Sequence, residues 1–299
     1  MMRNKLRRVL SNQSRKGIAS SIAITFTILI LMLALTIFTS VWVPYLAKEA
    51  ESNHFIGVQN DFGMLKASID NHILKQSNLT LFTPISMGSR GIPIFAPSPS
   101  SELSIYPADL LCNLTIGETG YGSATVSFGG GGLRYYVNNQ YYASGSVIYE
   151  NGAVIISQGS GAYMKYKPKF VIENVSSEGS DEYNYSLELS LITIYGDTVT
   201  KSSAEKNVLG VITKIVSSRE QVYTLQRLTL GGDANYVNLT IVTKYTDAWL
   251  GFFKDTLSES NLPDDEYSIY VIDGESISFR LNHTVRLAFR QSIILATME

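Results

Sequence analysis

The sequence predicts an α+β fold, in which one long amino-terminal helix precedes a mainly antiparallel β body of sandwich or barrel-like form. The first observation is a run without any charged residue from Ile18 to Ala47. The second is a stripe of apolar residues at helical spacing between Phe55 and Ile73. The third is a series of alternating, β-branched and tyrosine-rich segments from about Leu103 onward.

Residues 1–17 form a basic head, which contains arginine and lysine but no acidic residue. Basic residues beside a membrane segment tend to stay on the cytoplasmic side. We therefore expect this leader to lie in the cytoplasm and the residues after the helix to lie outside it.

Residues 18–76 are expected to form one long transmembrane helix. Its charge-free part exceeds the roughly 20 residues that span a bilayer, and a cleaved secretory signal has a shorter apolar core of about 7–15 residues. Pro44 should kink or loosen the helix. Beyond it, the apolar stripe predicts a helix that packs against the body. The stripe consists of Phe55, Val58, Phe62, Leu65, Ile69 and Ile73.

Proline, glycine and serine are frequent in residues 77–104, which predicts an irregular linker. Residues 105–299 then read as a β-rich domain outside the cytoplasm. The polar, weakly patterned stretch 196–207 is a candidate subdivision, so one domain and two smaller lobes both stay open.

Local signals predict several elements within this domain. Asn151-Gly152 and Asp273-Gly274 are typical of tight β-hairpins, because both residue types tolerate positive φ. Residues 246–259 should form one packed helix, capped by Thr246 or Asp247, with Trp249, Phe253 and Leu257 against the sheet. The last segment, from residue 284 to 294, alternates like a half-exposed antiparallel strand.

The junction of head and helix resembles a known signal. Arg15-Lys16-Gly17, followed by Ile18-Ala-Ser-Ser-Ile22 and a long apolar helix, is similar to the class III signal peptide of archaeal type IV pilins and archaellins. The resemblance implies that a prepilin peptidase cuts between Gly17 and Ile18 and that the helix stays on the mature protein. Residues 49–66 resemble an uncharacterised group of archaeal pilin-like surface proteins. Many pilins carry Glu where this chain has Ile22. The absence of this carboxylate removes one contact between neighbouring subunits in a filament.

The resemblance covers residues 13–76 and implies a structural protein of the cell surface, not an enzyme. Such a protein would be a filament subunit, a minor pilin or another surface component, with the lipid bilayer, prepilin peptidase and other pilin-like subunits as partners. The alternative is a plain single-pass anchor that is never processed or polymerised. In that case the β body would bind a ligand or a glycan.

Sequons of the form Asn-x-Ser/Thr recur beyond the helix and predict a glycoprotein. Their candidate acceptors are Asn78, Asn113, Asn174, Asn184, Asn238 and Asn282. All of them fall on the side of the membrane that the basic head predicts to be external.

Composition argues against other classes of function. A net charge of −2 gives no overall positive charge that would attract nucleic acid. A single cysteine, Cys112, cannot form a disulfide within the chain. The three histidines are far apart in the sequence. Gly129–Gly132 precedes a strand pattern, whereas a phosphate loop precedes a helix. We therefore expect no catalytic residues, no metal and no cofactor.

Overall fold

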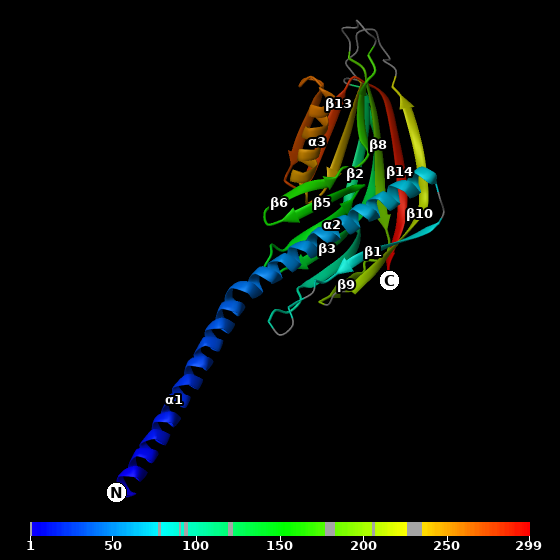
Figure 1. Ribbon diagram of the computed structural model, residues 1–299. Coiled ribbons are helices and arrows are strands. Elements are labelled where there is room, and N and C mark those ends of the chain that lie inside the picture. Colours follow the sequence, from blue (N-terminus) through cyan, green and yellow to red (C-terminus); the bar gives the residue numbers. More distant parts are fainter. Residues whose placement is uncertain are drawn as a thin grey trace.

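The computed structural model describes residues 2–299 except 77–78, 90, 93–94, 119–121, 177–182, 205–206 and 226–234, and only the backbone of 2–19 and 107–110. One long amino-terminal helix is followed by a mostly antiparallel β body, which confirms the α+β class (Figure 1).

The amino-terminal helix is continuous in the chain but not uniform. It consists of α1 (Met2–Ile37), a π-helical turn (Phe38–Trp42) and α2 (Val43–Lys75). The helix therefore begins earlier than the predicted residue 18. It ends as predicted, because Gln76 adopts the left-handed conformation (φ 47°) that terminates a helix. Figure 1 shows α1 projecting away from the body, whereas α2 crosses it.

Two sheets build the body. The five-stranded sheet has the order β1-β10-β14-β8-β7, and the nine-stranded sheet has the order β12-β13-β11-β2-β3-β4-β5-β6, with β9 paired to β2. The strands of the first sheet are β1 (Thr80–Met87), β7 (Phe170–Asn174), β8 (Tyr185–Tyr195), β10 (Asn207–Thr224) and β14 (Thr284–Met298). Those of the second are β2 (Ser100–Glu118), β3 (Gly122–Asn138), β4 (Gly145–Glu150), β5 (Ala153–Gln158), β6 (Gly161–Tyr166), β9 (Thr200–Ser203), β11 (Asn235–Val242), β12 (Tyr267–Ile272) and β13 (Ser276–Asn282).

Both sheets contribute to each of two cores. The first core forms where the apolar stripe of α2 packs on β1, β10 and the β2–β5 region, and all six stripe residues are buried there. The second core joins the sheets farther from α2 and includes α3 (Thr246–Ser260) through Trp249, Phe253 and Leu257. Strand β4 lies between the two cores, and all of its residues are therefore buried.

Two short-range hairpin predictions are confirmed. Asn151 (φ 45°) and Gly152 (φ 79°) connect β4 to β5, with Glu150 opposite Ala153. Asp273 (φ 51°) and Gly274 (φ 69°) lie between β12 and β13. The positive φ angles that these residue types tolerate are the physical basis of both turns.

Two other local predictions are wrong, and a third is only partly right. Residues 80–87 are strand β1 and not irregular linker, and Pro84 is accommodated because β1 is an edge strand, which needs fewer N–H donors. Strand β14 pairs antiparallel with β10, as predicted, but it is a central strand that also pairs in parallel with β8, and Ala288 and Ser292 are buried instead of exposed. The residue that caps α3 is Tyr245, which makes no side-chain capping bond.

The stretch 196–207 does not divide the β body. Strand β8 before it and strand β10 after it both pair with β14. Within the same stretch, β9 crosses to the other sheet and pairs with β2. Each core also contains residues from before and after it, so the described strands form one body.

Candidate functional site

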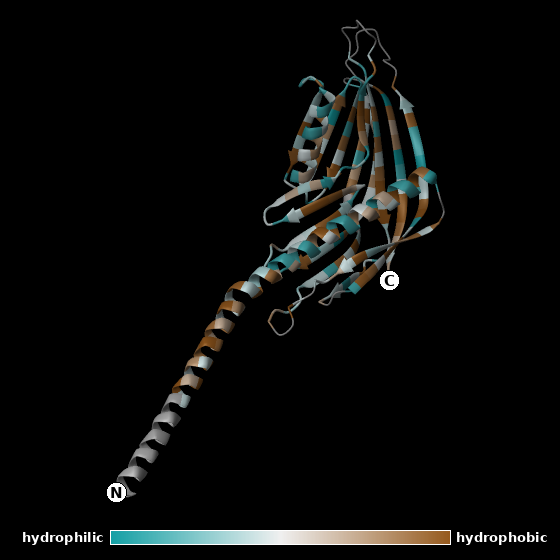
Figure 2. Ribbon diagram, viewed as in Figure 1, coloured by the Kyte–Doolittle hydropathy of each residue, from teal (hydrophilic) through white to brown (hydrophobic). Residues whose placement is uncertain are grey.

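The exposed part of the amino-terminal helix is the most unusual surface of the molecule. From Ile22 to Leu46, its large apolar side chains remain between 39% and 64% exposed, except Val43. Figure 2 shows hydrophobic residues, in brown, along the part of the helix that extends beyond the body. Among the described residues, this is one helix long and apolar enough to cross a membrane. Water solvates such a surface poorly, and its length and composition suit a membrane-spanning helix.

The predicted processing residues lie at the start of this helix. Arg15, Lys16, Gly17 and Ile18 have helical backbone within α1, and their side chains lie outside the described part of the chain. The cut between Gly17 and Ile18 therefore stays a prediction.

The π-helical turn marks the place where the helix reaches the body. Pro44 has no N–H, so an α-helical ladder would leave the carbonyl of Ser40 without its usual donor. The ladder shifts here, and the Val43 N–H bonds to the Phe38 carbonyl five residues earlier. The prediction that Pro44 loosens the helix is thus confirmed, and Figure 1 shows a change of direction close to this point.

Apolar contacts with the body begin at this turn. Val43 and Ala47 are buried with Ala96 from the β1–β2 connection, and Tyr141 packs against them. Phe38 also meets Phe95 edge to face, with ring centroids 5.5 Å apart. The helix therefore changes from fully exposed to partly packed within about two turns.

Glu51 joins the helix to the loop between β3 and β4. Its side chain is buried, with 3% of its surface exposed. Its Oε1 accepts the backbone N–H of Gln140 at 3.1 Å, and its Oε2 accepts those of Tyr141 at 2.8 Å and Tyr142 at 2.6 Å. One carboxylate thus satisfies three loop donors that secondary structure does not pair.

More polar bonds follow along the helix. His54 Nε2 lies 2.7 Å from the Tyr135 hydroxyl, and the Ser86 N–H donates to Asp61 Oδ2 at 2.8 Å. Lys165 Nζ donates to Gln59 Oε1 at 2.7 Å. Together with the buried stripe, these bonds fix the orientation of α2 on both sheets.

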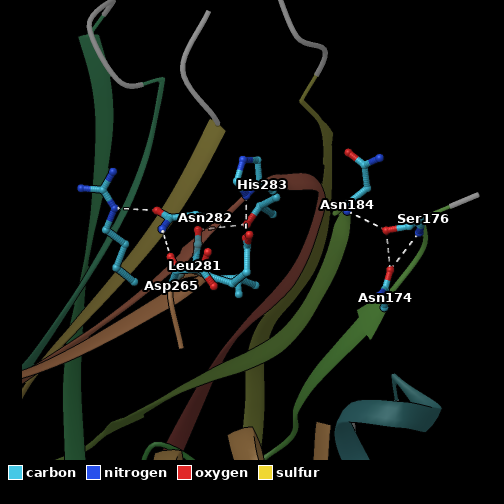
Figure 3. Close-up of polar contacts among 10 residues, drawn as sticks. Asn174, Ser176, Asn184, Asp265, Leu281, Asn282 and His283 are labelled. Atoms are coloured by element: carbon cyan, nitrogen blue, oxygen red, sulfur yellow. Dashed lines mark hydrogen bonds and ion pairs between the residues drawn. The ribbon is translucent and has the colours of Figure 1, made fainter. Parts of the chain in front are cut away.

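Two predicted sequons share one corner of the body, at the end of the β7–β8 hairpin (Figure 3). Asn174 is exposed, and its Oδ1 accepts the N–H and the hydroxyl of Ser176 at 2.9 and 2.6 Å. The same Ser176 hydroxyl oxygen accepts the Asn184 N–H at 2.9 Å. Figure 3 shows the Asn184 side chain pointing away from these partners.

Asn282 is held by its neighbours. Its Oδ1 accepts from Arg280 Nε at 3.1 Å, and its Nδ2 donates to the Asp265 carbonyl at 3.2 Å. The hydroxyl of its sequon partner, Thr284, is buried and donates to the Leu281 carbonyl. A glycan on Asn282 would displace the bond that its amide nitrogen makes.

The other sequons differ in setting. Asn113 and Asn238 lie on neighbouring strands β2 and β11, with Asn238 opposite Thr115 and Asn113 opposite Thr240. Asn238 Oδ1 accepts the Ser278 hydroxyl at 2.8 Å. Asn113 Oδ1 is buried and has no hydrogen-bond partner among the described residues. Asn78 lies outside the described residues.

The contacts of Glu51 were missed by the sequence reasoning, although one signal was present. Glu51 precedes Phe55 by four residues and thus continues the spacing of the buried stripe towards the amino terminus. A charged residue in phase with a buried stripe needs a specific partner. Its partners, residues 140–142, lie too far along the chain for local patterns to identify.

Comparison of the chain with protein-family models, with curated proteins and with solved structures found no match.

Proposed function

We propose that this chain is a pilin-like structural protein of the archaeal cell surface. A prepilin peptidase removes residues 1–17, the helix from Ile18 stays in the membrane or in a bundle of like helices, and the β body lies outside the cell. The observation that carries this proposal is the bare apolar helix that continues directly into a helix docked in the body core.

The energetics of the apolar helix support exchange between lipid and protein. Both environments are apolar, so moving the helix from one to the other changes hydrophobic free energy little. Packing then decides association, and small residues allow close approach of helices. Ala19, Ser20, Ser21 and Ala23 provide such a small surface near the proposed mature terminus. Ile22 supplies no carboxylate to pair with a neighbouring terminus, so this contact would be absent.

The junction with the body supports a mechanical role. The buried stripe, the Glu51 carboxylate and the Asp61–Ser86 bond connect α2 to strands and loops from both sheets. A body attached in this way follows the helix as a rigid unit. In a filament, the same attachment would fix the position of the body relative to the helical bundle.

We further propose that the sequons carry glycans selectively. Asn174 and Asn184, at the end of the β7–β8 hairpin, are the most suitable acceptors, because the first is exposed and the side chain of the second points away from its neighbours. Asn282 is the least suitable, because its side-chain amide is bonded on both atoms.

The external position of the body can be tested by cysteine labelling. The native Cys112 is buried, and burial, with a smaller contribution from Glu150, raises its pKa to about 12, so it should not react with a maleimide. Thr198→Cys introduces a thiol at an exposed position between β8 and β9. In intact cells, a membrane-impermeant maleimide should label this variant as fully as it does after lysis and leave the wild type unlabelled. Labelling of Thr198→Cys only after lysis would place the body in the cytoplasm.

A further inference from the structure

A cavity of about 480 Å³ opens on the body between β2, β3, the β11–α3 connection and the β12–β13 turn. Six side chains decide its chemistry: Tyr106, Arg134, Glu150, Lys244, Tyr245 and Glu275. None of them belongs to the processing signal, the sequons or the apolar stripe of the helix.

Glu150 lines the deep part of this cavity, because only 1% of its surface is exposed. Its Oε1 accepts two hydrogen bonds of 2.7 Å, from the Thr243 hydroxyl and from the Trp249 indole N–H. Both bonds end on the same oxygen, and a carboxylate can accept further bonds on the other. The buried group thus retains acceptor capacity beside an open cavity.

A carboxyl group at this position is costly for the fold. Strand β4 is buried on both faces, and Glu150 shares its face towards the second core with Ile148 and with Ser146, whose hydroxyl oxygen accepts from Arg134 Nε at 3.2 Å. Burial raises the pKa of Glu150, while the bonds from Thr243 and Trp249 act in the opposite direction. A perturbed acid that lines a cavity is typical of a ligand site.

Two tyrosines form the walls. Tyr106 lies over Gly132, where an added Cβ would come within 2.5 Å of the Tyr106 hydroxyl oxygen. Gly132 lies opposite Tyr106 on one side and opposite Glu150 on the other. Because Gly132 has no side chain, the Tyr106 ring can lie over it, on the same face of the sheet as Glu150. Tyr245, directly before α3, lines the cavity as well.

The rim carries both signs of charge. Arg134 and Lys244 are exposed cations, and Glu275 is an exposed carboxylate. With Glu150, the cavity therefore holds two cationic and two acidic side chains. An anionic ligand would be repelled by the two acidic side chains, and a cationic ligand would be repelled by the two cationic ones. A neutral ligand with groups that both donate and accept suits all four.

We propose that this cavity binds a neutral sugar. Its hydroxyl groups would donate to Glu150 and accept from Arg134 and Lys244, and the faces of its ring would pack on Tyr106 and Tyr245. This inference goes beyond the proposed function and does not depend on processing or polymerisation of the helix.

A second cavity, of about 340 Å³, provides the matched control. It lies between α2, the β6–β7 connection and the five-stranded sheet. Six of its charged side chains are paired within the cavity, as Lys66–Asp70 at 2.6 Å, Lys169–Glu188 at 2.5 Å and Arg290–Glu220, and the seventh, Lys167, pairs with Glu259 outside it. A variant here changes the charge of the body without touching the Glu150 cavity.

The test uses the fluorescence of Trp249, which is bonded to Glu150. The chain has two tryptophans, and Trp42→Phe removes the other from the membrane helix. The full chain with this substitution is placed in lipid nanodiscs free of sugar-based detergent. It is titrated to tens of millimolar with methyl glycosides of glucose, galactose and mannose and with N-acetylglucosamine. Acetate and choline serve as anionic and cationic probes.

At least one sugar should change the Trp249 emission saturably, whereas acetate and choline should not. Arg134→Ala should weaken sugar binding about tenfold, since it removes a charged donor. Lys169→Ala, in the control cavity, should leave it unchanged, and unaltered circular dichroism establishes that the variants fold. The proposal is overturned if no sugar gives a saturable change, if acetate or choline binds instead, or if Arg134→Ala binds sugar like the parent.

Discussion

Two buried carboxylates, Glu51 and Glu150, hold together segments that lie far apart in the chain. Glu51 bonds to residues 140–142, and Glu150 bonds to Thr243 and Trp249. In both cases a carboxyl oxygen accepts donors that no regular backbone pairing satisfies. These two residues therefore add polar links to the apolar packing that attaches α2 and α3 to the strands.

Removal of the Glu51 carboxylate should loosen the helix from the body. Glu51→Ala leaves three backbone N–H groups without their acceptor, and we expect a loss of about 3 kcal/mol in the free energy of unfolding. Glu49→Ala is the control, because Glu49 is exposed on the same helix and should change stability by less than about 0.5 kcal/mol. Hydrogen exchange at residues 140–142 measures the local effect. Equal protection of these amides in Glu51→Ala and wild type would contradict this role.

Glu150 should make stability depend on pH. Its pKa is raised in the folded chain above the unfolded value of about 4.3. The folded state thus holds its proton more tightly, so this contribution is fully present below the unfolded pKa and is lost as pH rises through the folded pKa. Glu150→Gln keeps a carbonyl oxygen for Thr243 and Trp249 but cannot ionise. Its melting temperature relative to wild type should therefore rise as the pH increases from about 4.3, the unfolded pKa, through the raised pKa of the folded state. A constant difference across this range would refute the assignment.

Residue-level prediction from sequence reached the sequons but not these carboxylates. A sequon and a charge-free run are both local patterns, so their positions can be read directly from the amino-acid sequence. The partners of Glu51 and Glu150 are about 90 or more residues away. Only the pairing of strands brings them together, and local periodicity carries no information about that pairing.

At the scale of elements, α2 is the part that the sequence predicts best. Its buried face follows the 3.6-residue period, and the structure buries every residue of the predicted stripe. Strands β1 and β14 show the limit of such patterns. Pro84 favours irregular structure in the sequence, but β1 tolerates it because this strand lies at a sheet edge. The alternation in β14 predicts a half-exposed strand, but β14 is central and also pairs with β8.

Two isoleucines on α2 test the docking of this helix. Ile69 is 1% exposed in the first core, whereas Ile56 is 47% exposed on the same helix. Ile69→Ala should reduce the free energy of unfolding by about 2–5 kcal/mol through lost contacts and a cavity. Ile56→Ala should change it by less than about 0.5 kcal/mol. Denaturant unfolding in nanodiscs measures both. Similar losses for the two variants would show that α2 does not dock through this face.

At the scale of the whole molecule, one helix has two environments. Its first part exposes apolar side chains, and its second part closes the core of the β body. The change of charge and spacing along residues 1–76 predicted this division, because both signals are local. The sequence left open whether residues 196–207 divide the body into two lobes. The answer depends on β8 and β10 pairing with the same strand, β14, which local patterns do not reveal.

The mature amino terminus tests the central claim most directly. The full chain is expressed in archaeal cells with an active prepilin peptidase, and the membrane-bound protein is analysed by intact mass and terminal peptide mapping. The pilin-like proposal predicts a protein that begins at Ile18 and retains the complete apolar helix. A membrane-bound protein that still begins at Met1 or Met2 would contradict it and leave a plain, unprocessed anchor.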